Sequence, residues 1–420
     1  MDLVLTNGRL FDGHEVFENA TVIVRDGKIF RVIDEDEKSQ SNIKEISYKQ
    51  DRKYYDLKGQ TIIPGLIDSH VHVDLHGMAD TYDENLVEDK LRAIRAAQEM
   101  QQTLMSGITM VRSVGSVNWI DLSVKEAIEQ GFIEGPRMLT SGKILCITAP
   151  GSEYFNGLYQ EANGYDGFKE AARDQLKRGA DLLKIMATGA IMNPGGVAGA
   201  EQPDVDEIRA VVEEAEKLNK KVAAHAHGAQ GIKNAIEAGV HTIEHGTFAD
   251  DESHQMMINH GVYLIPTLAP DYFMSVNGEE GGVAPFMIEK LKHKKEVRKK
   301  NLKKAIQRGV KIAIGSDAGT PYNFHGNNAR EMWLMVEEGM MTPKEAIASG
   351  TRISAEACGL IDQLGTLEMG KMADLVVVNG NPLEDIGLLL EKQNMNLIMK
   401  AGQVVKEMVT PEVELTKEAQ

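Results

Sequence analysis

Cysteine is almost absent from this sequence, which has only Cys146 and Cys358 in 420 residues. Two cysteines cannot form a disulfide framework or a thiolate zinc cluster. Any metal site in this chain must therefore be built from histidine, carboxylate and other side chains.

Basic residues and long apolar runs are also in short supply. Lys and Arg number 46 against 63 Asp and Glu, which gives a net charge of −17. This net charge argues against a nucleic acid partner, because phosphate binding needs a basic surface. A contribution to solubility is sufficient to explain it. No run approaches the roughly 18 apolar residues of a membrane span, and the first residues do not resemble a secretion signal. We therefore expect a cytoplasmic protein that does not contact the membrane.

The length of the chain predicts more than one structural unit. A single hydrophobic core stops growing at roughly 250–300 residues. Residues 2–32 and 365–405 carry short strand-like runs, with turn signals at Asn7-Gly8, Asp12-Gly13 and Asp26-Gly27. We predict a small β-sandwich domain formed by both chain ends, residues 1–60 plus 365–412. A polar loop is expected at 34–54 and an exposed tail at 413–420.

The middle of the chain, residues 61–364, alternates short β-branched runs with longer helical patterns. A nucleotide-binding Gly-x-Gly-x-x-Gly after an early strand is missing, which argues against a doubly wound sheet. Helices are expected at 85–105, 167–178, 205–219 and 284–307. The predicted strands are 66–73, 108–113, 137–141, 181–186, 221–225, 241–244, 262–267 and 311–316. Eight such strands within about 300 residues predict an α/β fold, the (β/α)8 TIM barrel.

Polar side chains gather at the carboxyl ends of these strands, where such barrels build their active sites. Residues two apart in a strand face the same side, so His70 and His72 converge on one point. Neutral imidazole and carboxylate are suitable ligands for zinc and related ions. The candidate metal-site residues are His70, His72, Lys184, His225, His227, His245 and Asp317.

Lys184 is unexpected in an otherwise apolar strand, because an unpaired ammonium is costly to bury. Burial lowers the pKa of a lysine and frees its neutral amine, which CO2 can convert into an anionic carbamate able to bridge two cations. Asp317, beside two metals, can hold one ion and accept a proton from water. Taken singly, the lysine suits a salt bridge and the aspartate a helix cap. Together with the histidines they indicate a metal site.

Several motifs resemble the amidohydrolase superfamily. They are Pro-Gly-Leu-Ile-Asp-Ser-His-Val-His at 64–72, the lysine of the fourth strand, Ile-Glu-His-Gly at 243–246, Gly-Ser-Asp-Ala-Gly at 315–319 and the glycine-bounded segment that begins at Gly365. Three further motifs resemble one branch of that superfamily, the imidazolonepropionase-related branch. They are His-Ala-His-Gly at 225–228, Pro-Thr at 266–267 and His-Gly at 325–326. That branch includes prolidases (Xaa-Pro dipeptidases) and carboxypeptidase-like enzymes.

The resemblance implies two divalent metal ions. Zinc is the expected metal, with manganese or cobalt as alternatives, and a CO2-derived carbamate on Lys184 would bridge the two ions. His70, His72 and Asp317 would hold the more buried ion, and His225 and His245 the second. His227 then becomes a substrate-side group. The remaining candidates for substrate binding are His325 and Tyr154.

The expected reaction is hydrolysis of an amide or peptide bond in a dipeptide or N-acyl amino acid. A hydroxide that bridges the two metals would attack, with Asp317 as general base and then general acid. The alternatives are hydrolysis of a cyclic, imidazolone-type amide, or deamination. A non-catalytic binding barrel is disfavoured because no ligand is missing. We expect a homo-oligomer that binds a small molecule.

One departure from related sequences concerns the region after the third strand. They commonly carry Gly-Gly-His there, whereas this chain reads Thr148-Ala149-Pro150-Gly151 and continues to Phe155. Substrate preference is therefore expected to differ from that of the relatives. The sequence leaves open the roles of the 144–165 loop and of the glycine-rich segment 193–200, which is a candidate lid.

Overall fold

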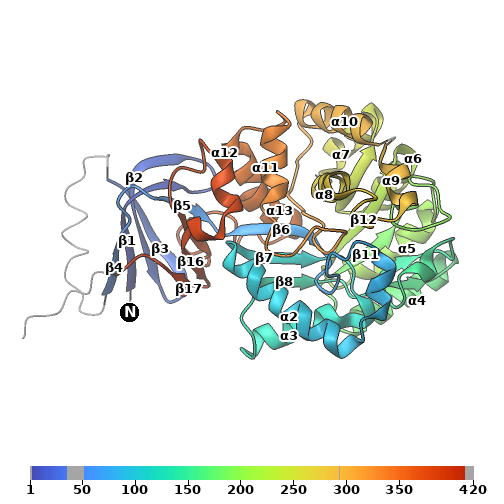
Figure 1. The fold of residues 1–420 in the computed structure, drawn as a ribbon, viewed down its shortest axis with the longest axis horizontal. Helices are drawn as coiled ribbons and strands as arrows, with labels where there is room; N and C mark the ends of the chain where they lie inside the picture. The colour runs from blue at the N-terminus through green and yellow to red at the C-terminus, as the bar shows by residue number, and fades with distance from the viewer. Residues whose placement is uncertain (1, 36–51, 293, 412–420) are drawn as a thin grey trace, which may run out of the picture.

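The computed structural model describes residues 2–35, 52–292 and 294–411. Most of the polar loop predicted at 34–54 and all of the tail predicted at 413–420 lie outside the described residues. Figure 1 shows two units, a β-rich one that contains the N-terminus and a larger one in which helices surround strands.

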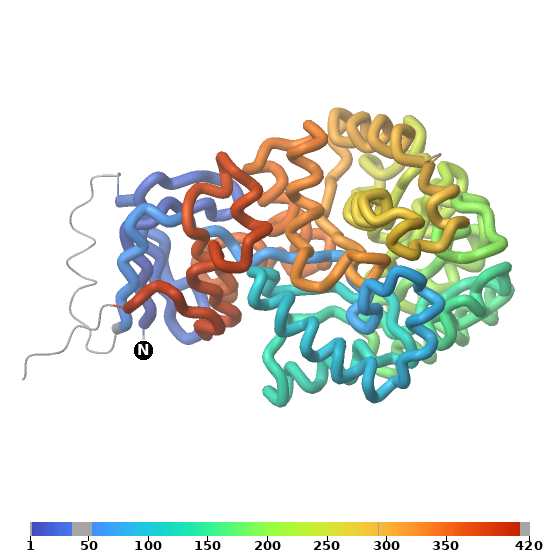
Figure 2. The backbone as a smooth tube through the Cα atoms, in the orientation of Figure 1, coloured from blue at the N-terminus to red at the C-terminus, as the bar shows by residue number. Residues whose placement is uncertain are grey.

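Strands from both ends of the chain share one 8-stranded sheet, with the order β17-β16-β15-β5-β1-β2-β3 and β4 against β1. The strands are β1 (Asp2–Phe11), β2 (Val16–Arg25), β3 (Lys28–Asp34), β4 (Arg52–Asp56), β5 (Thr61–Pro64), β15 (Leu375–Val378), β16 (Met395–Lys400) and β17 (Gln403–Glu407). The early and late chain segments accordingly lie together in Figure 2. This β-rich unit has its own hydrophobic core, which includes Leu5, Ile62 and Val377.

The turn signals of the first strands have different outcomes. Asp26-Gly27 connects β2 to β3, and both residues adopt positive φ, as a tight hairpin requires. The turn predicted at Asn7-Gly8 is wrong, because β1 continues through it with a break in register between Leu5 and Gly8. A Cβ on Gly8 would lie 2.8 Å from Leu57 Cδ1, so close packing explains this glycine.

The barrel strands form two parallel sheets, β6-β7-β8 and β10-β9-β11-β12-β13-β14. Their bounds are β6 (Leu66–Val71), β7 (Ile108–Ser113), β8 (Arg137–Thr140), β9 (Ile144–Cys146), β10 (Tyr159–Glu161), β11 (Leu182–Met186), β12 (Lys221–Gly228), β13 (Thr242–Phe248) and β14 (Tyr263–Ile265). The strand predicted at 137–141 is β8, which pairs with β7, and the additional strand β9 after it pairs with β11. The eighth strand position of the barrel is the segment that contains Ile312 and Ala318. Isolated bridges connect it to β14, through Leu264–Ile312, and to β6, through Val71–Ala318. The predicted barrel with a β-sandwich from both chain ends is thus confirmed, while the exact domain boundaries stay predictions.

Helices follow the barrel strands and cover them from outside (Figure 1). They are α2 (Asp89–Met105), α3 (Ile120–Glu129), α4 (Gly164–Lys177), α5 (Val205–Glu216), α6 (Ala229–Ala238), α7 (Asp251–His260), α8 (Ala269–Asn277), α9 (Pro285–Lys292), α10 (Lys295–Arg308), α11 (Arg330–Glu337), α12 (Pro343–Ala348) and α13 (Ser354–Cys358). Short helical turns lie at Thr81–Leu86, Val117–Trp119, Ser152–Tyr154, Ser349–Ile353, Ile386–Leu390 and Lys392–Asn394. Within the described ranges, no helix is both long and apolar enough to cross a bilayer.

The helix predicted at 284–307 is two helices, α9 and α10. The break coincides with the burial of Lys294, which precedes α10 and contacts Asp271 of α8. Helical periodicity alone does not reveal such a break, because it depends on a partner in another helix.

Candidate active site

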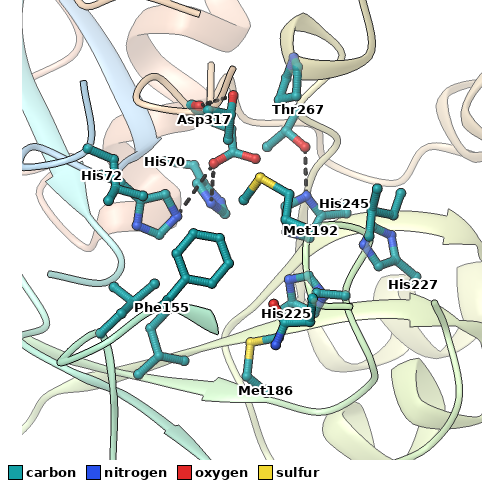
Figure 3. A pocket seen from close by; sticks show the side chains of 18 of the residues that line it. His70, His72, Phe155, Met186, Met192, His225, His227, His245, Thr267 and Asp317 are labelled. Carbon is teal, nitrogen blue, oxygen red and sulfur yellow. Dashed lines mark hydrogen bonds and ion pairs between the residues drawn. The ribbon is translucent and has the colours of Figure 1, made fainter. Parts of the chain in front are cut away.

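The carboxyl ends of the barrel strands bring the predicted metal-site residues to one cavity of about 680 Å³, a volume that includes its open mouth. His70 comes from β6, Lys184 from β11, His225 and His227 from β12, and His245 from β13. His72 directly follows β6, and Asp317 lies at the end of the eighth strand position. Figure 3 shows six of these side chains around a common space.

Three residues of this wall have left-handed backbone conformations. The φ values are 71° for His245, 51° for Thr267 and 54° for Asp317. Such positions cost of order 1–3 kcal/mol each for residues other than glycine, and they persist where the surroundings enforce them. Their concentration here agrees with a functional site.

His70 of β6 and His72, which follows that strand, both direct Nε2 at Asp317. His70 Nδ1 lies 2.6 Å from Glu244 Oε2, and His72 Nδ1 lies 2.9 Å from the carbonyl oxygen of Gly115. Both partners can only accept, so each Nδ1 donates, and in the neutral ring the lone pair is on Nε2. The Nε2 atoms lie 3.4 Å and 3.5 Å from Asp317 Oδ1 (Figure 3).

The histidines of β12 and β13 form a second group. His245 Nδ1 lies 2.7 Å from Thr267 Oγ1, and His227 Nδ1 lies 2.8 Å from Thr247 Oγ1. The ring centroids of His225 and His245 are 4.4 Å apart, and those of His225 and His227 are 4.7 Å apart. Three imidazoles therefore meet within the reach of a single ion.

Burial favours the neutral form of four of the five imidazoles. It lowers the pKa of His72 to about 4 and holds the pKa values of His225, His227 and His245 well below the usual range. Burial opposes the ionisation of Asp317, yet His70 and His72 lower its pKa to about 2. His70 is the exception, because the opposing effects of burial and Lys184 are outweighed by Asp317 and Glu244, which raise its pKa. Neutral histidines and an ionised carboxylate are the protonation states that metal binding requires, and Asp317 and the other four histidines have them.

Three buried polar atoms of this cluster lack a hydrogen-bond partner among the described residues, although one of them, Asp317 Oδ1, has the ion-pair contacts given above. Lys184 is 2% exposed, and its Nζ has no hydrogen-bond partner among the described residues. The same is true of His225 Nε2 and Asp317 Oδ1. Burial lowers the pKa of Lys184 to about 8, against the opposing effect of Glu244. Unpaired donors and acceptors of this kind are costly unless a ligand satisfies them, so the residues fit divalent ions.

Two sets of side chains have the geometry of ion sites. Their potential ligand atoms lie within 4.8 Å of one another in His225, His227 and His245, and likewise in His70, His245 and Asp317. The grouping differs in part from the predicted one, because His227 joins the second-ion set and His245 reaches both sets. The assignment of each ligand therefore stays a prediction.

Sequence reasoning missed the pair that supports His70. Glu244 Oε1 accepts from Arg112 Nη2 at 2.8 Å, and both side chains are buried. Arg112 also donates to the carbonyl oxygen of Ser69, which precedes His70. Although burial raises the pKa of Glu244, Arg112 and Lys184 outweigh that effect and lower it. The signal was present, since Glu244 directly precedes His245 in the quoted motif.

Two predicted substrate-binding residues are not among the wall residues of this cavity. The Tyr154 hydroxyl donates to Asp80 at 2.6 Å, and His325 Nε2 lies 3.1 Å from the carbonyl oxygen of His72. Phe155 and Tyr159 line the wall instead, and Tyr159 donates to Asn193 of the glycine-rich segment. The rest of the wall is largely apolar and includes Ile144, Leu158, Met186, Ile191, Met192 and Met274.

Comparison with known proteins agrees with this geometry. Residues 61–405 match the amidohydrolase family, and residues 3–49 match the NagA composite domain. The chain therefore belongs to the amidohydrolase family.

Three individual proteins illustrate the similarity. An ochratoxinase of Aspergillus niger is 31% identical over 82% of this chain and 75% of its own length. The structure of a Xaa-Pro dipeptidase with methionine bound in its active site is 33% identical, has a TM-score of 0.87, and covers 97% of this chain and 100% of its own. An imidazolonepropionase of Geobacillus sp. (strain WCH70) is 24% identical over 93% of this chain and 91% of its own.

The resemblance inferred from the motifs is thereby confirmed. Together with the histidine and aspartate clusters, the family identifies the chain as a metal-dependent amidohydrolase that acts on C–N bonds.

Proposed function

We propose that this enzyme hydrolyses the amide bond of a dipeptide or an N-acyl amino acid. The observation that carries the proposal is the apolar cavity beside the histidine, lysine and aspartate cluster. An apolar wall of this size suits an amino-acid side chain, while the polar end suits the scissile amide. The similarity to a Xaa-Pro dipeptidase that binds methionine in its active site supports the same substrate class.

The proposed ligands are His70, His72 and Asp317 for one ion, and His225 and His245 for the other. Zinc is the proposed metal. Bound divalent ions would supply Lewis acidity, which lowers the pKa of water and polarises a carbonyl group.

Lys184 is proposed to bridge the two ions as a carbamate. Its neutral amine adds to CO2 with release of one proton, and the product supplies two anionic oxygens. The support is its complete burial, its unpaired Nζ and its lowered pKa.

The proton path runs through Asp317. Its carboxylate accepts a proton from the attacking water and delivers it to the leaving nitrogen as the C–N bond breaks. The water oxygen stays on the carbonyl carbon, so the products are a carboxylic acid and an amine. His227, held by Thr247, would face the substrate carbonyl.

A substrate panel tests the proposal. Zinc-, manganese- or cobalt-loaded enzyme is incubated with Xaa-Pro and Xaa-Arg dipeptides and with N-acyl amino acids, and products are identified by mass spectrometry. We expect a free amino acid from substrates with an apolar side chain. Release of ammonia, or turnover of imidazolones alone, would instead identify a deaminase or a cyclic-amide hydrolase.

That the protein forms a homo-oligomer stays a prediction. Light scattering tests it by measuring the molar mass in solution.

A further inference from the structure

A buried cluster of three charged residues borders the cavity on the side of α8 and α10. Asp271 Oδ1 lies 2.9 Å from Lys294 Nζ, and Asp271 Oδ2 lies 2.9 Å from Arg298 NH1. The exposed fractions are 3% for Asp271 and 6% for each cation. Asp271 and Lys294 both line the cavity, whereas Arg298 is not among its wall residues.

The charges of this cluster do not cancel. Two cations share one carboxylate, which leaves an excess of one positive charge in a site that is largely shielded from water. Glu331, which Arg298 also influences, does not offset it, because burial raises the pKa of Glu331 to about 8 and its oxygens accept from the amides of Leu268 and Ala269. Asp317 also influences Lys294, but its carboxylate faces His70 and His72. A buried excess charge calls for an anionic partner.

Of the two cations, Lys294 is the one available to a ligand. Arg298 NH1 is engaged twice, since it also donates to the carbonyl oxygen of Thr267 at 3.2 Å. Within the described part of the chain, the Lys294 ammonium has Asp271 as its ion-pair partner and keeps further N–H groups for the cavity.

Lys294 also lies within electrostatic range of the metal-site histidines. Burial and His225 lower the pKa of His227, and Lys294 adds to that effect. The cavity thus has a cation at one point of its wall, the proposed reacting centre at another, and apolar side chains such as Met274 and Ile191 between them.

We propose that Lys294, held by Asp271 and supported by Arg298, binds the carboxylate of the substrate. This inference rests on the proposed function and narrows it. The residue released by hydrolysis must carry a free carboxylate, so dipeptides and N-acyl amino acids are cleaved in preference to their C-terminal amides. Neutral His227 cannot supply that charge, and Tyr154 and His325 are engaged elsewhere.

The test separates carboxylate recognition from catalysis. L-methionine and L-methioninamide are titrated into metal-loaded enzyme by calorimetry, and hydrolysis of L-alanyl-L-methionine and its C-terminal amide is measured in parallel. We expect the wild type to favour each carboxylate by roughly 10–100-fold, the range for a hydrogen bond between charged groups. Lys294→Met should abolish the preference for the carboxylate through KM and Kd.

Matched variants keep the result unambiguous. Lys295→Met removes a neighbouring exposed lysine and should behave as wild type. Lys294→Arg keeps the charge and should retain most of the preference. The inference is overturned if Lys294→Met keeps the wild-type ratio, or if the wild type binds L-methionine and L-methioninamide equally, a result that needs no variant to fold. Absence of hydrolysis of both dipeptides and N-acyl amino acids, despite Lys294-dependent binding of L-methionine, would instead overturn the proposed function.

Discussion

Glu244 and His70 are joined by a contact of 2.6 Å between Oε2 and Nδ1, and neither side chain is exposed to solvent. The carboxylate sets the ring so that Nε2 faces the cavity, and Arg112 fixes the carboxylate in turn. Two buried residues on other barrel strands, Glu244 of β13 and Arg112 of β7, therefore orient His70, a proposed metal ligand.

Glu244→Gln tests this arrangement. The amide can no longer match the charge of Arg112, and loss of one partner of a buried ion pair costs about 3–5 kcal/mol. Metal affinity should fall roughly 10–100-fold, as for other residues that orient a metal-binding histidine. Urea unfolding and metal titration measure the two effects. Glu216→Gln, on the exposed face of α5, is the control, and unchanged metal affinity in Glu244→Gln would refute the orienting role.

Lys184→Ala tests the bridging role. We expect the variant to bind fewer ions than the two proposed for the wild type and to lose roughly 100-fold or more in kcat/KM, because the proposed shared anionic ligand is removed. Acetate or propionate should restore part of the activity by filling the space left by the side chain. Elemental analysis and carbon-13 labelling with bicarbonate check metal content and the carbamate. Full activity and metal content in the untreated variant would eliminate the bridge.

His225 and His227 have different proposed roles, and single substitutions separate them. His225→Asn should lose metal along with activity. His227→Gln should keep its metal and lose roughly 100-fold in kcat, as expected when one donor to the reacting carbonyl is removed. Since both rings lie in one possible ligand group, loss of an ion in His227→Gln would make His227 the ligand instead.

Chelation tests the dependence on metal. The apo-enzyme should be inactive and should unfold a few degrees lower, because ions that bind only the folded state stabilise it. Its far-ultraviolet circular dichroism should be unchanged, since the strands that carry the ligands belong to the barrel itself. Activity in the fully chelated protein would contradict the metal-dependent mechanism.

The placement of the site was predictable where strand periodicity and barrel geometry act together. His70 lies in β6 and His72 directly follows it, while Lys184, His225 and His245 lie in the neighbouring strands β11, β12 and β13, whose carboxyl ends point the same way. In a barrel, those ends meet at one mouth. Tyr154 shows the limit of this reasoning, because which residue of a loop enters the cavity depends on packing. Phe155 lines the wall, whereas Tyr154 turns to Asp80.

The sequence by itself determined the barrel, the composite β-sandwich and the gathering of histidine, lysine and aspartate, since these follow from local periodicity and composition. The shortage of cysteine pointed to the same ligand types. Only the tertiary structure decided that Arg112 supports Glu244 and that Lys294 meets Asp271 across two helices. The residues of such a pair lie far apart in the chain. Which residues pair depends on their burial and distance in the folded protein, and residue spacing in the sequence does not predict either.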